Sequence, residues 1–193
     1  MDFLVRSFRK AEGHGKALTG ESMGAEVYWI EGPWPGRLAI LPRPRGGEWL
    51  EDEVQSLRAA GLDVLVSTLE NDETAELDLT RESEICRAQG LEFISFPVED
   101  RGVPATENGT LELARRLETY LAAGRKVGIH CRQGIGRSAL LAACILALSG
   151  LDAETALQRI QTARGCTVPD TEEQRDWIKR FADAQDVARA GGK

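Results

Sequence analysis

Hydrophobic positions along the chain fall into two patterns, short continuous runs and stretches with helical spacing. Runs of about four to eight apolar residues are typical of strands buried on both faces of a sheet, whereas apolar residues three and four apart indicate amphipathic helices. The runs predict strands over 27–30, 37–41, 62–69 and 126–130, and alternation predicts a further strand over 91–98. The spacing predicts helices over 48–60, 80–89, 106–123, 138–149, 152–164 and 171–188.

Strands alternate with helices, and helices alone complete the chain. This order favours a single-domain α/β fold with a mainly parallel central sheet of about four or five strands, flanked by helices. Asp152 is the expected N-cap of its helix, and Thr171 with Gln174 fits a capping box. Residues 1–26 show no clear period, and we expect them to form a lead-in to one domain over residues 27–189.

Composition narrows the class of protein. The 193 residues carry a formal net charge of −7, which argues against a nucleic-acid partner. The longest stretch without a charged residue, 138–151, is too short to span a bilayer, and the N-terminus has no apolar core of signal-peptide length. We therefore expect a cytoplasmic protein without a membrane partner.

The cysteines and histidines limit the possible chemistry further. The chain has two histidines and four cysteines, and no two cysteines form a CxxC pair. This spacing predicts neither a zinc site nor a disulfide framework, and we expect no metal or other cofactor. Most isolated cysteines are buried packing residues, which is the interpretation for three of the four: Cys86, Cys144 and Cys166.

The stretch VGIHCRQGIGRSALL, residues 127–141, combines a nucleophile with features that bind anions. A predicted strand leads through a loop into a predicted helix, whose free N–H groups and positive dipole end attract anions. Gly134 and Gly136 let the loop amides face inward, and the Arg137 guanidinium matches phosphate oxygens. The same positive field stabilises a thiolate at Cys131. The sequence therefore predicts a phosphate site with a cysteine nucleophile.

Residues 130–138, HCRQGIGRS, resemble the H-C-x5-R-S/T signature of the cysteine-based protein tyrosine and dual-specificity phosphatases. Five residues separate Cys131 from Arg137, as in that superfamily. The resemblance implies that Cys131 attacks phosphorus and that the Ser138 hydroxyl stabilises the departing thiolate, although Ser138 could also cap the helix. It also implies substrate binding by the loop residues Arg132, Gln133, Gly134, Ile135, Gly136 and Arg137.

Cleavage of a phosphate ester also requires an acid for the leaving oxygen. Residues 96–104, FPVEDRGVP, resemble the general-acid loop of the same superfamily, which places the acid at Asp100. Arg101 stands where the large tyrosine-specific enzymes often have an aromatic residue. Glu99 is the alternative acid, and a turn-forming role for Asp100 is the alternative without catalysis.

Together the two loops imply a metal-independent phosphomonoesterase of the small dual-specificity or kinase-associated branch. It would act on phosphotyrosine, and in the dual-specificity case also on phosphoserine and phosphothreonine, through a cysteinyl-phosphate. We expect His130 to brace the loop by hydrogen bonding unless it is a core histidine, and Gln174 to position water. The expected partner is a phosphorylated protein or a small phosphomonoester, and the expected oligomeric state is a monomer.

Three other functions compete with this interpretation. GIGRSA, residues 134–139, matches a dinucleotide-binding fingerprint, but a further strand with an acidic residue about 20 positions on is missing. Rhodanese-like sulfurtransferases also use a cysteine loop closed by arginine, usually with four intervening residues. The third alternative is a module that binds phosphate through this loop but does not catalyse hydrolysis.

Overall fold

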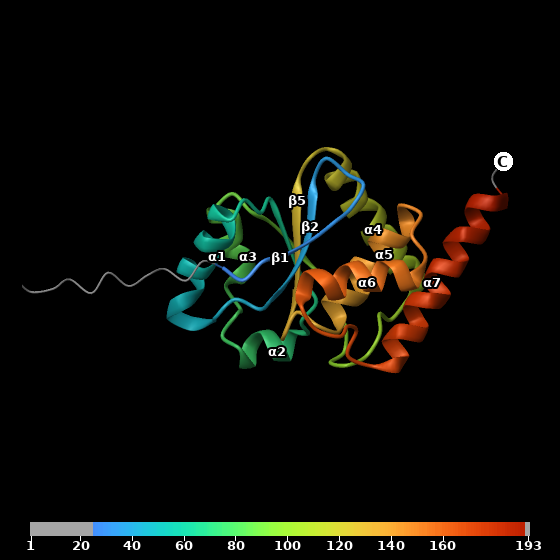
Figure 1. Ribbon diagram of the computed structural model, residues 1–193. Coiled ribbons are helices and arrows are strands. Elements are labelled where there is room, and N and C mark those ends of the chain that lie inside the picture. The colour runs from blue at the N-terminus through green and yellow to red at the C-terminus, as the bar shows by residue number, and fades with distance from the viewer. Residues whose placement is uncertain (1–24, 192–193) are drawn as a thin grey trace, which may run out of the picture.

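The computed structural model describes residues 25–191, so the expected lead-in lies almost entirely outside the described residues (Figure 1). The strands are β1 (Tyr28–Ile30), β2 (Arg37–Pro42), β3 (Val64–Ser67), β4 (Glu92–Ser95) and β5 (Lys126–Cys131). The α-helices are α1 (Leu50–Ala59), α2 (Asn71–Glu76), α3 (Glu82–Ala88), α4 (Glu107–Ala122), α5 (Arg137–Leu148), α6 (Ala153–Arg164) and α7 (Glu172–Gly191). A single 3-10 turn, Gly47–Trp49, leads into α1.

The five strands form one sheet in the order β1-β2-β5-β3-β4. β1 pairs antiparallel with β2, and all the other pairs are parallel. The predicted α/β fold with a mainly parallel sheet is therefore confirmed. β5 lies in the middle of the sheet, where its neighbours cover both of its edges, and this explains the apolar character of its sequence.

Helices cover both faces of the sheet (Figure 1). On one face, alternate strand residues such as Ile40 and Val66 pack with α4, α5, α6 and α7. On the other face, their neighbours Leu41 and Leu65 pack with α1 and α3. α5 is buried along almost its whole length, as expected because residues 138–148 carry no charge. Two rings of α7, Trp177 and Phe181, stack at 5.5 Å between centroids and close the outer layer.

Most predicted elements are present with shifted ends, and one helix was missed. The predicted strands 62–69 and 91–98 shorten to β3 and β4. α2 was not predicted because NDETAE contains no apolar stripe; its start is instead held by a side chain, since the Glu70 N–H donates to Glu73 Oε2 at 3.1 Å. The Asp152 N-cap is confirmed, because its carboxylate accepts from the Thr155 N–H at 2.9 Å.

The sheet brings distant segments to one edge. The register pairs Pro42 with Cys131 and Ser67 with His130, so β2, β3 and β5 end at the same level. Ligands of open parallel sheets bind beyond the carboxyl ends of the strands. The segments that follow β3, β4 and β5 therefore meet there, and they include α2, the Asp100 loop and the Cys131 loop.

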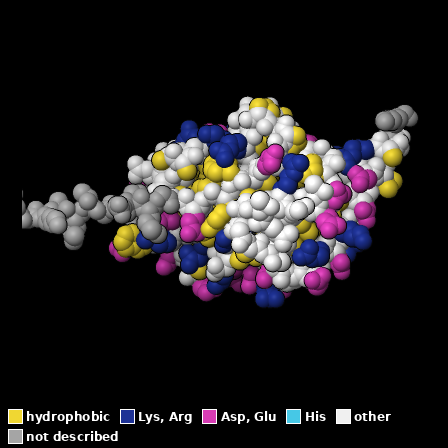
Figure 2. Space-filling view, viewed as in Figure 1, with side chains coloured by type: hydrophobic (Ala, Val, Ile, Leu, Met, Phe, Trp, Pro, Cys, Tyr) yellow, Lys and Arg dark blue, Asp and Glu magenta, His cyan; other side chains and the backbone are white. Residues whose placement is uncertain are grey.

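Acidic and basic side chains are interspersed over the face of the molecule shown in Figure 2. Because the net charge is −7, we expect positive potential for an anion to come from the residues of the site itself. Among residues 25–191, no helix is long and apolar enough to cross a membrane.

Candidate active site

The loop between β5 and α5 is shaped by close packing at its two glycines. Gly134 has φ of +68°, and a Cβ there would lie 2.6 Å from the Leu41 carbonyl carbon of β2. A Cβ at Gly136 would lie 3.0 Å from Gln174 Oε1 of α7. The glycines therefore have a steric role besides the expected conformational one, because β2 leaves little room for a Cβ at Gly134 and α7 leaves little room for one at Gly136.

The Cys131 sulfur lies beneath this loop among hydrogen-bond donors. The Gly134 N–H donates to Sγ at 3.2 Å, and Ser138 Oγ lies 3.4 Å from Sγ. Burial alone would raise the pKa of Cys131, but the Ser138 hydroxyl and the loop amides outweigh it and the pKa is lowered. Burial without such donors has the opposite effect at Cys86, where it raises the pKa to about 12.

Arg137 is buried, with 2% of its side chain exposed, and four interactions fix its guanidinium. Nη1 donates to Glu73 Oε2 at 2.5 Å and to the Val98 carbonyl at 3.0 Å. Nη2 donates to Glu73 Oε1 at 3.0 Å and to Asp100 Oδ1 at 2.9 Å. The two carboxylate oxygens of Glu73 therefore fix the plane of the Arg137 guanidinium next to the Cys131 loop.

Asp100 reaches the site from a loop that is tied to the start of α7. Gln174 Nε2 donates to the Gly102 carbonyl at 2.9 Å, and Thr171 Oγ1 donates to the Arg101 carbonyl at 3.4 Å. Arg101 itself adopts a left-handed conformation with φ of 60° and lies 3.6 Å from Asp170. The Asp100 side chain remains 57% exposed while it contacts Arg137.

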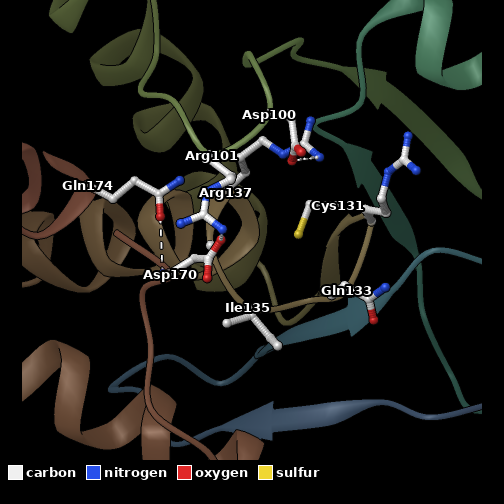
Figure 3. Close-up of a pocket in the computed structure, with 10 residues that line it drawn as sticks. Asp100, Arg101, Cys131, Gln133, Ile135, Arg137, Asp170 and Gln174 are labelled. Carbon is white, nitrogen blue, oxygen red and sulfur yellow. Dashed lines mark hydrogen bonds and ion pairs between the residues drawn. The ribbon is translucent and has the colours of Figure 1, made fainter. Parts of the chain in front are cut away.

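Cys131, Asp100, Arg137 and Gln174 converge on one cavity of about 170 Å³ (Figure 3). The cavity is lined by these four residues together with Arg101, Arg132, Gln133, Ile135, Gly136 and Asp170. The structure thus brings the predicted nucleophile, the predicted acid and most of the predicted binding residues to one place.

The structure adds detail to three of the predicted residues. The Arg132 side chain turns to the acidic helix α2, where it contacts Glu73 and Glu76 at 3.3 and 3.1 Å. Ser138 is not an N-cap, because α5 begins at Arg137 and its hydroxyl faces Cys131 instead. His130 makes no side-chain hydrogen bond to the loop within residues 25–191.

His130 instead forms a buried pair with Glu82 of α3, with Nε2 at 3.1 Å from Oε1. Burial lowers the pKa of His130, but the Glu82 carboxylate and Cys131 outweigh the burial and the pKa is raised. The side chain faces away from the cavity, as expected for a strand residue next to Cys131.

Gln174 lies at the cavity, but the predicted capping box is only half formed. The Gln174 N–H donates to Thr171 Oγ1 at 3.2 Å, as in a capping box. Its side-chain Oε1, however, accepts from the Asp170 N–H rather than from Thr171, at 3.2 Å. The amide side chain therefore links α7 to both Asp170 and the Asp100 loop.

Sequence reasoning missed Glu73, Asp170 and Arg164 around the loop. Glu73 follows β3, so the rule that ligands bind at the carboxyl ends of strands could have marked it. Asp170 and Arg164 lie beyond the loop in sequence, and no local pattern marks them. The described residues contain no group of three or more His, Cys, Asp or Glu side chains that could hold a metal ion.

Comparisons with known proteins agree with this geometry. The family described as "Dual specificity phosphatase, catalytic domain" matches residues 57–182. Cyclin-dependent kinase inhibitor 3 of Rattus norvegicus is 24% identical over 136 residues, which cover 69% of this chain and 64% of the rat protein. The chain therefore spans less than two thirds of the length of that curated relative.

Solved structures give the same result for the fold. A kinase associated phosphatase whose catalytic-site cysteine is replaced by serine superposes with a TM-score of 0.78 at 21% identity, covering 86% of this chain and 99% of that one. Tk-PTP in its active form superposes with a TM-score of 0.67 at 28% identity, covering 81% and 96%. Because the match over residues 57–182 covers well over half of the chain, the chain belongs to the dual specificity phosphatase family.

Proposed function

We propose that the protein hydrolyses phosphomonoesters through a cysteinyl-phosphate, in which phosphorus is bonded to the sulfur of Cys131. One observation carries this proposal: the Cys131 sulfur accepts from the Gly134 N–H at 3.2 Å, beneath a guanidinium that also contacts Asp100. A stabilised nucleophile, an oxyanion site and an acid thus share one cavity. We further propose that residues 27–189 form the catalytic domain.

Phosphate binding would rearrange the contacts of Arg137. Nη1 and Nη2 already donate to Glu73, Val98 and Asp100. A phosphate that takes a bidentate position on the guanidinium would replace the Asp100 carboxylate at Nη2. The displaced Asp100 then becomes available to the leaving oxygen of the substrate. Substrate binding and placement of the acid are therefore coupled.

The first step forms a bond between sulfur and phosphorus as the ester P–O bond breaks. The leaving oxygen takes the proton of Asp100, and the loop amides and Arg137 stabilise the charge on the equatorial oxygens. In the second step water attacks phosphorus, gives its proton to Asp100, and the S–P bond breaks. The Ser138 hydroxyl, 3.4 Å from Sγ, would stabilise the departing thiolate, and Gln174 would orient the water.

The substrate we propose is a phosphorylated protein, with phosphotyrosine as the first residue to test and phosphoserine and phosphothreonine as further ones. Two relatives support a protein substrate by their names, cyclin-dependent kinase inhibitor 3 and kinase associated phosphatase. Ile135 offers an apolar contact at the cavity for a phenyl ring. A panel of the three phosphopeptides distinguishes tyrosine specificity from dual specificity.

Replacement of Cys131 tests the proposed function directly. Cys131→Ser should reduce hydrolysis of p-nitrophenyl phosphate to background, because a serine hydroxyl at this position is not ionised. Cys166 is exposed, so its interpretation as a buried packing residue was wrong, and Cys166→Ser is a matched control that should retain wild-type turnover. Wild-type turnover in Cys131→Ser would contradict the proposal, and phosphate binding without turnover in the wild type would identify a binding module.

Replacement of Asp100 tests the acid. Asp100→Asn should lower kcat about 10²- to 10⁴-fold, the usual contribution of general acid catalysis. Glu99→Gln, at the neighbouring exposed carboxylate, should keep the wild-type kcat. The reverse result, a large loss of kcat in Glu99→Gln and little loss in Asp100→Asn, would assign the acid to Glu99.

Replacement of Glu73 tests the clamp on Arg137. Glu73→Gln removes the buried carboxylate that holds the Arg137 guanidinium by both oxygens, which should cost about 3–5 kcal/mol of unfolding free energy. A misplaced guanidinium should lower kcat/KM by about 10²-fold. Burial raises the pKa of Glu73, but its arginine partners outweigh the burial and lower it, so the stabilisation is present above the unfolded-state pKa and is lost as pH falls through the folded-state value.

The control for this variant is Glu76→Gln on the same helix. Glu76 is 64% exposed and pairs with Arg132 alone among the arginines of the site. We expect near wild-type stability and kcat/KM in Glu76→Gln, measured by urea unfolding and steady-state kinetics. Equal effects of the two substitutions would show that Glu73 has no special role.

A further inference from the structure

Arg164 contacts the Cys131 loop from outside the cavity. It is the last residue of α6, and its guanidinium donates to two successive carbonyls of the loop. Nε donates to the Gly134 carbonyl at 3.1 Å, and Nη2 donates to the Gln133 carbonyl at 3.2 Å. Arg164 is absent from the residues that line the cavity, so its role must act through the loop.

The two carbonyls belong to the peptide units whose N–H groups serve the sulfur. The Gln133 carbonyl shares a planar peptide unit with the Gly134 N–H, which donates to Cys131 Sγ at 3.2 Å. The Gly134 carbonyl shares the next unit with the Ile135 N–H, one of the amides that lower the pKa of Cys131. Because C=O and N–H point in opposite directions across a trans peptide, a donor on the outer carbonyl holds the N–H inward.

The charge on Arg164 strengthens this arrangement. A hydrogen bond from a charged donor polarises the peptide unit that accepts it, which makes the N–H on the far side a better donor. In both peptide units, 133–134 and 134–135, the carbonyl accepts from the Arg164 guanidinium, and the N–H contributes to the environment of the Cys131 sulfur.

Arg164 is itself held in place for this contact. Its guanidinium carbon lies 4.2 Å from the centre of the Tyr28 ring, on β1. An arginine in the last turn of a helix often satisfies the carbonyls of its own helix end. Here the observed donors go to Gln133 and Gly134 instead, and Gly165 with φ of 77° ends α6 without help from the side chain.

We propose that Arg164 is a positioning residue for the candidate active site: its guanidinium holds two successive peptide units of the 133–135 segment so that their N–H groups face the Cys131 sulfur. This inference rests on the proposed function, because it assigns to Arg164 the role of maintaining the hydrogen-bond environment of the proposed nucleophile, Cys131. Arg164 and the Tyr28 ring that supports it then belong to the site, although both lie outside residues 130–138, the signature loop.

Other groups around the sulfur bear on its ionisation and must stay constant in the test. The charged and titratable side chains of the surrounding elements are His130, Arg132 and Arg137 of the β5–α5 segment, Glu73 of α2, Asp100 and Arg101 of the acid loop, and Asp170 before α7. Substitution of Arg164 leaves all of them unchanged, so the comparison isolates its own contribution.

The test measures the ionisation of Cys131 rather than turnover. The rate at which iodoacetamide alkylates Cys131 is followed from pH 4 to 10 by mass spectrometry of the peptide that contains it. The midpoint of this pH dependence is the pKa of Cys131. In Arg164→Gln we expect the midpoint to rise by about one pKa unit, which means about tenfold less thiolate at a pH below the midpoint. The matched control is Arg159→Gln on the same helix, whose guanidinium donates to the Glu31 carbonyl at 3.2 Å and should show the wild-type midpoint.

Arg164→Lys separates positioning from charge. Lysine keeps the positive charge but cannot present the planar fork that reaches both carbonyls. We expect its midpoint to rise at least half as far as in Arg164→Gln. A wild-type midpoint in Arg164→Lys would overturn the proposal in favour of a simple charge effect, and this variant decides the question alone if Arg164→Gln does not fold.

An unchanged midpoint in Arg164→Gln with intact urea unfolding would also overturn the proposal. Failure of the proposed function looks different, because it appears as absent turnover in the wild type whatever the midpoint of Cys131. A purely structural role for Arg164 would lower the free energy of unfolding and leave the midpoint unmoved.

Discussion

The site depends on the hydrogen-bond donors that surround a buried sulfur, Cys131 Sγ. Burial of a charged group is costly unless donors replace the water that it loses. At Cys131 the donors are the Ser138 hydroxyl and the loop amides, and they outweigh burial, so the pKa falls. Cys144, buried in α5 behind the loop, shows the alternative, since burial raises its pKa well above the ordinary value. The same donors that stabilise the sulfur are those that a phosphate oxygen requires.

The fold supplies this environment by ending three parallel strands at one edge. β5 carries Cys131 there, β3 leads into α2 with Glu73, and β4 leads into the Asp100 loop. Glu73 then holds Arg137 by both oxygens, and Arg164 of α6 holds the loop from outside. Each support comes from a different segment of the chain. The signature loop is therefore necessary for the site but is held in shape by residues that lie far from it in sequence.

Sequence could predict the parts of the site that local geometry determines. The spacing from Cys131 to Arg137 and the glycines between them specify one strand-to-helix loop. The sheet around it follows from short apolar runs that are separated by stretches with helical spacing. Glu73 escaped prediction because α2 is a short polar helix without periodicity, and Arg164 because its contact with the loop arises only from tertiary packing. Ser138 was assigned as a possible cap because the exact start of α5 is set by Gly136 and Arg137, a boundary that pattern does not resolve.

A crystal structure with orthovanadate, which takes the five-coordinate geometry of phosphoryl transfer, tests most directly whether an oxyanion binds between the Cys131 sulfur, the loop amides and the Arg137 guanidinium. We predict vanadium bonded to Sγ of Cys131, equatorial oxygens on the loop N–H groups and Arg137, and Asp100 moved from Nη2 to the apical oxygen. Vanadate bound elsewhere, with Asp100 still paired to Arg137 above an unmodified sulfur, would contradict this prediction.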